Sequence, residues 1–251
     1  MGLELLEKIT DPYERKARLY PACLAVIPVL ALALGQYGFS LKLEASMVGL
    51  LSALGVLYLA SSIVRELGKR LEGSLFAEWG GKPTTQVLRH RDKMIDPVTK
   101  ARYHAFLSEQ INVKFPSKKD EEAHPDVADT IYQSATKWLL DRTRDKKAFA
   151  LLFQENIAFG FRRNCLGIKP FSIIIALSTL FWSLFTNDVV TSQKINLGAL
   201  HGFTFGAWFS LGASLLMLVI WLFYFTKRTV RTAAFAYADM LLRSCDVLPK
   251  K

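Results

Sequence analysis

The sequence predicts an all-α membrane protein with two transmembrane hairpins, four transmembrane helices in all, that flank a helical cytosolic insert. Three observations lead to this prediction. The 251-residue chain gathers its apolar residues into four long runs almost free of charge, although soluble proteins also reach its hydrophobic fraction of 51%. A polar stretch, Arg65–Lys169, separates the second run from the third. Helical spacing recurs through that stretch, and it contains no sustained strand alternation.

The N-terminal 18 residues are charged and carry apolar side chains at roughly helical spacing, which predicts a short helix on the membrane surface. Asp11 and Pro12 form a helix start, with the aspartate as cap and the proline in the first turn. The first apolar run, Leu19–Phe39, is long enough to cross a bilayer and contains two prolines that can kink it.

The second crossing, Ala45–Val64, follows a tight loop at Ser40–Glu44. Apolar residues then repeat every four positions from Ile63 to Leu75, so we expect this helix to continue as an amphipathic stalk to Trp79. The Gly-Gly-Lys-Pro sequence that follows should end it.

The insert reads as a series of helices. Asp96 followed by proline predicts a helix over Pro97–Gln110, and Phe115–His124 reads as a polar loop. Pro125 then opens a helix, and a last one over Lys147–Asn164 leads directly into the third crossing. The predicted apolar face of the helix from Pro125 consists of Val127, Ile131, Ala135, Trp138 and Leu139.

The second hairpin consists of a third crossing at Ile168–Phe185 and a fourth at Phe203–Phe225. The tail, Thr226–Leu248, is predicted to be an amphipathic helix. Its apolar side is Val230, Ala233, Ala234, Tyr237, Leu241 and Leu242. The predicted divisions are a surface helix (1–18), a first hairpin (19–64), a basic helical cytosolic domain (65–167), a second hairpin (168–225) and a C-terminal cytosolic helix (226–251).

Charge sets the predicted orientation. The net charge is +10, and of the 32 Lys and Arg only Lys42 and Lys194 lie in the two short hairpin loops. The positive-inside rule therefore predicts that both termini and the insert face the cytoplasm. The insert holds 20 of the basic residues and 14 of the 22 acidic ones, so it is itself basic.

A basic run in the insert is a candidate ligand site. It consists of Lys82, Arg89, His90, Arg91, Lys93, Lys100, Arg102 and His104. Such a cluster can bind phosphates through charge and paired donors, and Tyr103 and Phe106 could stack on bases. The alternative is a solvated face, or a surface that rests on anionic lipid.

A second candidate lies just before the third crossing. Phe159, Phe161, Arg162, Arg163 and Asn164 place two aromatic rings, two guanidinium groups and an amide at a membrane entrance. This composition fits a gate or an anion site, and the plainer alternative is an interfacial anchor.

Small residues recur every four positions in and just before the fourth crossing, at Gly202, Gly206, Ser210 and Ser214. Such a row allows close helix packing or lines a pore. None of the four membrane cores contains Asp, Glu, Lys, Arg or His, which argues against proton relays and ion-coupled transport and leaves a passive pore open. A single four-helix subunit encloses little space, so a pore calls for a homo-oligomer, for which we assume a tetramer.

No residue set indicates catalysis. The four histidines lack metal-ligand spacing, and the sequence has no nucleophile motif and no complete phosphate loop. We therefore expect a protein that is not an enzyme and that holds no metal or cofactor. The three separated cysteines, Cys23, Cys165 and Cys245, are expected to be reduced.

Two segments, Asp96-Pro-Val-Thr-Lys-Ala-Arg-Tyr-His104 and Glu155-Asn-Ile-Ala-Phe-Gly-Phe-Arg-Arg-Asn164, together with the layout of the whole chain, support a resemblance. The chain resembles the four-helix membrane effectors of bacterial antiphage defence and looks most like the Hailong type. The resemblance implies an oligomeric ion channel that a short single-stranded DNA, made by a partner nucleotidyltransferase, holds shut. It assigns no role to individual residues.

The leading interpretation is thus an oligomeric channel in the membrane, gated by a cytosolic nucleotide or oligonucleotide bound to the insert, which depolarises the cell. The alternative is a membrane scaffold without conductance, whose basic insert binds anionic lipid or a protein partner.

Overall fold

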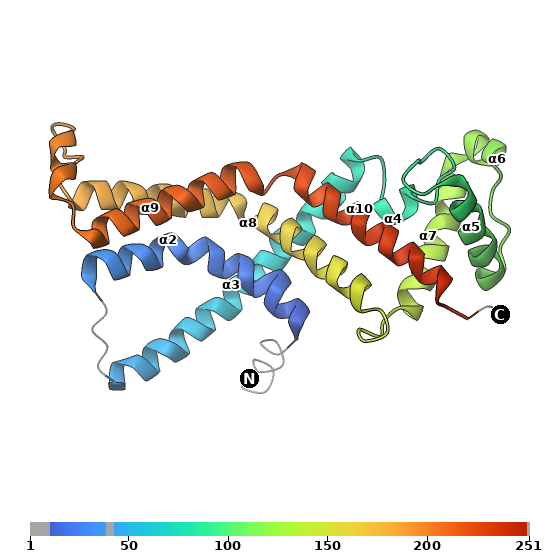
Figure 1. The fold of residues 1–251 in the computed structure, drawn as a ribbon, viewed down its shortest axis with the longest axis horizontal. Coiled ribbons are helices and arrows are strands. Elements are labelled where there is room, and N and C mark those ends of the chain that lie inside the picture. The colour runs from blue at the N-terminus through green and yellow to red at the C-terminus, as the bar shows by residue number, and fades with distance from the viewer. Residues whose placement is uncertain (1–10, 39–42, 250–251) are drawn as a thin grey trace. The chain divides into compact units, whose positions relative to one another are not determined.

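The fold was analysed in a computed structural model, which describes residues 11–38 and 43–249. These residues form helices and no strand, apart from one isolated antiparallel bridge between Val190 and Ile195. The chain divides into two compact units (Figure 1). We call Met1–Leu71 with Gly160–Thr229 the apolar unit, and Glu72–Phe159 with Val230–Lys251 the polar unit.

The apolar unit begins with a π-helix, η1 (Glu14–Leu19), that runs directly into α2 (Tyr20–Tyr37). Asp11 starts the helix as expected, because its carboxylate accepts hydrogen bonds from the amides of Tyr13 and Glu14 at 2.7 and 3.2 Å. Of the surface helix expected over residues 1–18, residues 1–10 lie outside the described part of the chain.

Two long helices contribute to both units. Helix α3 spans Leu43–Glu78, which confirms that the predicted second crossing and its stalk form one helix, and Gly80 and Gly81 end it with φ angles of 84° and 128°. Helix α8 spans Ala150–Thr186, so the last insert helix and the third crossing are also continuous.

The second hairpin continues through a 3-10 helix, η2 (Leu197–Gly202), and α9 (Phe205–Val219) into a π-helical end, η3 (Ile220–Tyr224). Figure 1 shows α9 beside α2 and α8. Helix α10 (Lys227–Arg243) and a short 3-10 helix, η4 (Ser244–Asp246), end the fold.

Among the residues that the structure describes, three helical segments are long and apolar enough to cross a membrane: Glu14–Gln36, Ala150–Thr186 and Phe205–Tyr224. They include the whole of the predicted third crossing and most of the predicted first and fourth crossings. The second, Ala45–Val64, lies in α3, but most of its side chains fall outside the described residues, so this second crossing stays a prediction.

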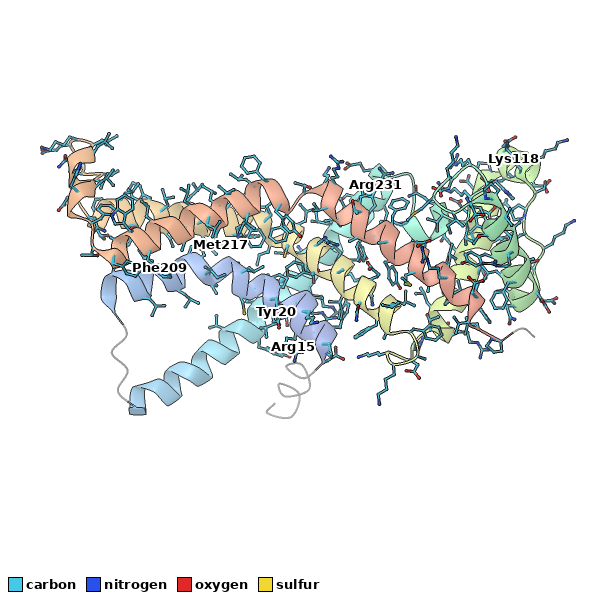
Figure 2. All side chains as sticks on the ribbon, viewed as in Figure 1. Arg15, Tyr20, Lys118, Phe209, Met217 and Arg231 are labelled. Atoms are coloured by element: carbon cyan, nitrogen blue, oxygen red, sulfur yellow. The ribbon has the colours of Figure 1, made fainter. Side chains whose placement is uncertain are left out.

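The core of the apolar unit consists of Ala25, Cys165, Met217, Trp221 and Phe225, which come from α2, α8, the C-terminal end of α9, η3 and the residue that follows η3. Met217 is labelled on α9 in Figure 2. Close helix contacts make this core possible. A Cβ atom at Gly206 would collide with the backbone of Gly35, so α2 and α9 approach backbone to backbone at this point.

The polar unit packs α4 (Pro83–Gln86), α5 (Pro97–Ile111), α6 (Lys118–Ala123) and α7 (Pro125–Arg142) with the C-terminal part of the chain. Leu107, Tyr132 and Leu139 are fully buried in its core, together with Leu241 of α10. The predicted amphipathic tail thus buries its apolar side, although Tyr237 is only partly buried.

Two local predictions were wrong in part. The buried face of α7 is Ala128, Tyr132, Ala135, Thr136 and Leu139, whereas Val127 is 62% exposed. The expected loop before it contains α6. Its first turn is closed by a capping box, in which Ser117 and Asp120 each bind the backbone amide of the other.

Candidate functional site

Helix α5 positions the central members of the predicted basic cluster. The carboxylate of Asp96 caps it by accepting hydrogen bonds from the amides of Val98 and Thr99, at 3.1 and 2.9 Å. This confirms the predicted start and fixes which residues face inward. Lys100 and His104, four positions apart, both lie on the buried side of the helix.

Lys100 is only 5% exposed, and its ammonium group is used inside the fold. Nζ donates to the carbonyl oxygens of Arg89 and Asp92 at 2.7 and 2.6 Å. Burial lowers the pKa of this lysine below its usual value. The ammonium therefore holds the irregular segment before α5 in place.

His104 has the same function at the neighbouring carbonyl. Its Nε2 lies 2.7 Å from the oxygen of Leu88, and because a carbonyl can only accept, this nitrogen carries the proton. Burial lowers the pKa of His104 to about 4. The side chain is a neutral donor at physiological pH.

Arg89 is 7% exposed and forms a forked pair with Asp129 of α7. Nε donates to Oδ1 at 2.8 Å and Nη2 to Oδ2 at 2.5 Å, while Nη1 donates to the carbonyl of Gly80 at 2.8 Å. The hydrogen bond to Asp129 raises the pKa of the guanidinium. All three nitrogens of this arginine are thus bound inside the protein.

The predicted stacking residues are also in the interior. Tyr103 is 3% exposed and donates from its hydroxyl to Asp246 at 2.9 Å; burial, followed by this bond, raises its pKa to about 12. Phe106 packs against Trp138, with ring centroids 6.1 Å apart. Neither ring face is presented to solvent for a base to stack on.

The other predicted ligand residues, apart from the partly buried His90, are exposed. Lys82, Arg91 and Lys93 lie on the surface, and Arg102 is exposed but forms an ion pair with Asp246 at 3.0 Å. The basic run therefore separates into a buried set that holds the fold together and an exposed set that is accessible to a ligand.

Sequence reasoning did not single out a buried polar centre around Glu121, which is 6% exposed. Its Oε2 accepts from the hydroxyl of Tyr132 at 2.7 Å and from the backbone amide of His90 at 2.8 Å. Burial, together with this hydrogen bond, raises the pKa of Tyr132. The signal was the capping box at Ser117, which predicts the helix that turns Glu121 inward.

Two of the predicted gate residues, Arg163 and Asn164, occupy a helix junction in the apolar unit. Arg163 is 3% exposed and Asn164 fully buried. Arg163 donates from Nε and Nη2 to the Oδ1 of Asn164 at 3.0 and 2.8 Å, and Asn164 donates from Nδ2 to the carbonyl of Ala17 at 2.7 Å. A Cβ at Gly68 would collide with Asn164, so this glycine brings α3 against α8.

The other members of that set are less enclosed. Phe159, Phe161 and Arg162 are partly buried. Phe161 packs edge to face against Phe225, with centroids 5.9 Å apart. The five residues therefore do not form one cluster. Arg163 and Asn164 are the most enclosed of them.

The row of small residues lies mainly in a packing interface. Ser210 and Ser214 are fully buried, and the hydroxyl of Ser214 lies 3.1 Å from that of Thr179 on α8. Gly206 faces Gly35. Gly202 lies in η2, outside α9, with open space around it. This arrangement agrees with the interpretation of the row as close packing.

Lys169 is a further polar link that the sequence analysis did not identify. Its Nζ donates to the carbonyl oxygens of Leu222 and Phe225, each at 3.0 Å. A cation at a helix C-terminus meets both unpaired carbonyls and the negative end of the helix dipole. Lys169 thereby ties the end of η3 to α8.

Within the described part of the chain, no group of three or more His, Cys, Asp or Glu residues could hold a metal ion. The three cysteines are free thiols. Comparison of the chain with family models, with curated proteins and with solved structures finds no match.

Proposed function

We propose that the chain forms a homo-oligomeric ion channel that crosses the bacterial inner membrane four times per copy, with the polar unit and both termini in the cytoplasm. A cytosolic nucleotide or short single-stranded oligonucleotide gates it. In the antiphage setting that the sequence resemblance suggests, a partner nucleotidyltransferase supplies this ligand and the open channel depolarises the cell.

The continuity of α3 and α8 is the observation that carries the proposal. Each is a single helix that supplies residues to both units, Leu43–Glu78 in one case and Ala150–Thr186 in the other. An α-helix is stiff along its axis, so a change in tilt at its polar end also moves its apolar end. A ligand with different affinity for two tilts would shift the population between them.

Aromatic side chains near both ends of the last span support its place in a bilayer. Phe205, Trp208 and Phe209 are exposed near the start of α9, and Phe223 and Tyr224 near its π-helical end. At 1.5 Å per residue the two groups are separated by roughly 25 Å, close to the thickness of the hydrocarbon layer of about 30 Å. Aromatic residues prefer the two membrane interfaces.

The packing of the hydroxyl side chains supports a pore between copies. Ser210 and Ser214 are fully buried within one chain, and Ser214 with Thr179 forms a hydroxyl pair between α9 and α8. Side chains that are enclosed in a helix interface cannot line a water-filled path. Conduction would therefore run between subunits.

Lys82, Arg91 and Lys93 are the surface that the proposal assigns to the anionic ligand. All three are exposed, and ammonium and guanidinium groups bind phosphate through charge-assisted hydrogen bonds. Affinity that depends on phosphate charge should fall as salt rises.

A membrane scaffold without conductance remains the second candidate, because a specific observation favours it. Arg89, Lys100 and His104 are satisfied inside the fold, which leaves fewer cations for a ligand than the sequence predicts. The surface cations that remain could instead rest on anionic lipid.

The direct test is the conductance of the purified protein in planar bilayers, with and without short single-stranded DNA. We expect discrete currents that change when the oligonucleotide is added. Absence of current in both conditions, from protein shown to be folded and oligomeric, would reject the channel and favour the scaffold.

Arg91→Glu combined with Lys93→Glu tests the ligand surface. We expect at least a tenfold loss of oligonucleotide affinity, measured by fluorescence anisotropy at fixed salt. Arg89 is left intact because its replacement would break the buried pair with Asp129. Lys119→Glu with Lys137→Glu makes the same charge change at two other exposed positions, and equal losses in both variants would show that the surface has no specific role.

A further inference from the structure

A cavity of about 220 Å³ opens in the polar unit where α7 ends and α8 begins. Its apolar lining comes from three helices, with Leu140 from α7, Leu152 and Phe153 from α8, and Tyr237 from α10. Leu152 is buried in the core, so this wall is held in place by the packing of the unit. The cavity is separate from the basic cluster discussed above, and none of its residues belongs to that cluster.

Polar groups line the rest of the cavity. The loop after α7 contributes Thr143, Arg144 and Lys146, and α8 contributes Asn156. The Nζ of Lys146 lies 5.0 Å from the centroid of the Phe153 ring, which puts a cation beside the aromatic wall. Two cations, an amide and a hydroxyl thus meet an apolar surface with two aromatic rings.

The loop that carries the cations has a defined conformation. The carboxylate of Asp145 accepts hydrogen bonds from the amides of Lys147 and Ala148 at 2.8 and 3.1 Å. The backbone carbonyl of Asp145 accepts a further one from the amide of Phe149 at 3.0 Å. Asp145 lies between the two cations in sequence, so this turn sets where both of their backbones lie. The cations are therefore presented at the cavity by a fixed turn.

Arg144 can exchange its present partner for a ligand at low cost. It pairs with Asp141 at 2.5 Å, but both side chains are largely exposed, at 79% and 51%. Ion pairs of this kind are worth roughly 0–1 kcal/mol. A bound carboxylate or phosphate group, next to an apolar wall that excludes water, offers a stronger partner.

We propose that this cavity binds a small organic anion built on one planar ring system, with the ring against Phe153 and Tyr237 and the anionic group at Arg144 and Lys146. Asn156 and Thr143 supply hydrogen bonds to polar atoms on the ring. Pockets for drug-sized ligands measure about 300–1,000 Å³, so this smaller cavity suits an aromatic carboxylate or the base and phosphate of a mononucleotide. Binding here does not depend on channel formation, and the site would stand if the proposed function failed.

Binding should be measured by ligand-observed saturation-transfer NMR on the full chain in lipid nanodiscs. The probes are 4-hydroxybenzoate and uridine 5′-monophosphate, each with its uncharged counterpart, 4-hydroxybenzyl alcohol or uridine, and inorganic phosphate alone. We expect one anion to bind with a Kd on the order of 0.1–1 mM, and its neutral counterpart and free phosphate to bind at least tenfold more weakly. The anion that binds identifies the source of the ligand.

Two variants locate the site. Arg144→Glu with Lys146→Glu should weaken the anion at least tenfold, whereas Lys119→Glu with Lys137→Glu should leave it unchanged. Leu140→Trp adds bulk at a side chain that is 40% exposed, so it should fill the cavity without a change of charge and abolish binding. The proposal is overturned if neither anion binds the wild-type chain, or if binding persists in both Leu140→Trp and the Arg144/Lys146 variant.

Discussion

At the scale of single residues, the main finding is that the fold uses charged side chains which the sequence presents as ligand groups. Lys100 and His104 donate to three carbonyls of one irregular segment, and Arg89 joins that segment to α7. Buried backbone carbonyls need partners, and a segment with little regular structure cannot supply them itself. The cations therefore replace the hydrogen bonds that a helix or sheet would provide.

The low pKa of His104 predicts that the polar unit loses stability in mild acid. Its folded-state pKa of about 4 lies below the unfolded value of about 6.5, so the unfolded chain takes up the proton first as the pH falls. The contribution of His104 to the free energy of unfolding is complete above pH 6.5 and declines between pH 6.5 and 4. The total loss from this group is on the order of 3 kcal/mol. Hydrogen exchange of α5 peptides, followed across that range in nanodiscs, would measure the decline.

The charged groups near His104 shift its pKa in both directions, so the prediction needs a variant that lacks this histidine. His90, whose ring centroid is 4.9 Å away, and Lys100 lower its pKa, whereas Glu121 raises it. His104→Gln removes the titrating group and should flatten the profile between pH 6.5 and 4, while His124→Gln on the surface should leave it unchanged. An unaltered acid loss in His104→Gln would assign it to other groups.

At the scale of elements, helix contacts in the apolar unit depend on glycines at defined points. Gly206 meets Gly35 where α9 crosses α2, and Gly167 meets Gly68 where α8 crosses α3, with a Cβ at Gly167 placed only 2.6 Å from the amide nitrogen of Gly68. Lipid offers no hydrophobic drive for helices to associate, so close van der Waals contact and interhelical hydrogen bonds must hold the bundle. The position of each glycine therefore determines the crossing point.

Two glycine-to-alanine substitutions on α9 should distinguish the effect of a lost helix contact from the effect of alanine on helix propensity. Gly206→Ala places a methyl group against the backbone of Gly35 and should destabilise the apolar unit by about 1–3 kcal/mol. Gly212→Ala, on the same helix but with nothing within 4 Å, should not destabilise it. Thermal unfolding in one detergent, followed by circular dichroism, compares the two, and equal midpoints would show that α2 and α9 do not pack closely there.

The error in the face of α7 also belongs to this scale. Hydrophobicity favoured Val127 and Ile131, but Tyr132 lies inside because its hydroxyl donates to the buried Glu121. Ala128 accompanies it because it lies four residues before Tyr132 on the same face. A polar partner on α6 thus decided the rotation of an amphipathic helix.

At the scale of the whole molecule, the distribution of charge along the chain predicts a membrane topology. Lys118 on α6 and Lys194 in the loop before η2 are both exposed (Figure 2 labels Lys118). The predicted topology places them on opposite sides of the membrane. If α3 crosses the membrane, the N-terminal region and the polar unit share one side. If it does not, they lie on opposite sides.

Cysteine labelling decides between these topologies. In a variant without the native cysteines, Lys16→Cys and Lys118→Cys should both be protected from a membrane-impermeant maleimide in intact cells, and Lys194→Cys should react. Labelling of all three after the membrane is permeabilised is the control. Reaction of Lys16→Cys in intact cells, with Lys118→Cys protected, would show that α3 does not cross and that the chain spans the membrane three times.

The sequence alone determined the helical class, the continuity of α3 and α8, and the start signals at Asp11 and Asp96. These depend on local physics, because caps, glycine breaks and apolar periodicity act within a few residues. It also located the small residues that pack α9, although it left packing and pore lining as alternatives.

Only the tertiary structure decided which cations are accessible and which hold the fold together. Arg89 finds Asp129 forty positions away, and Asn164 finds the carbonyl of Ala17 across 147 positions. Spacing along the chain does not encode such pairs, because burial of a charge depends on what packs over it. The cavity beside Arg144 could not be predicted from the sequence for the same reason. Its walls come from three helices that are brought together only by folding.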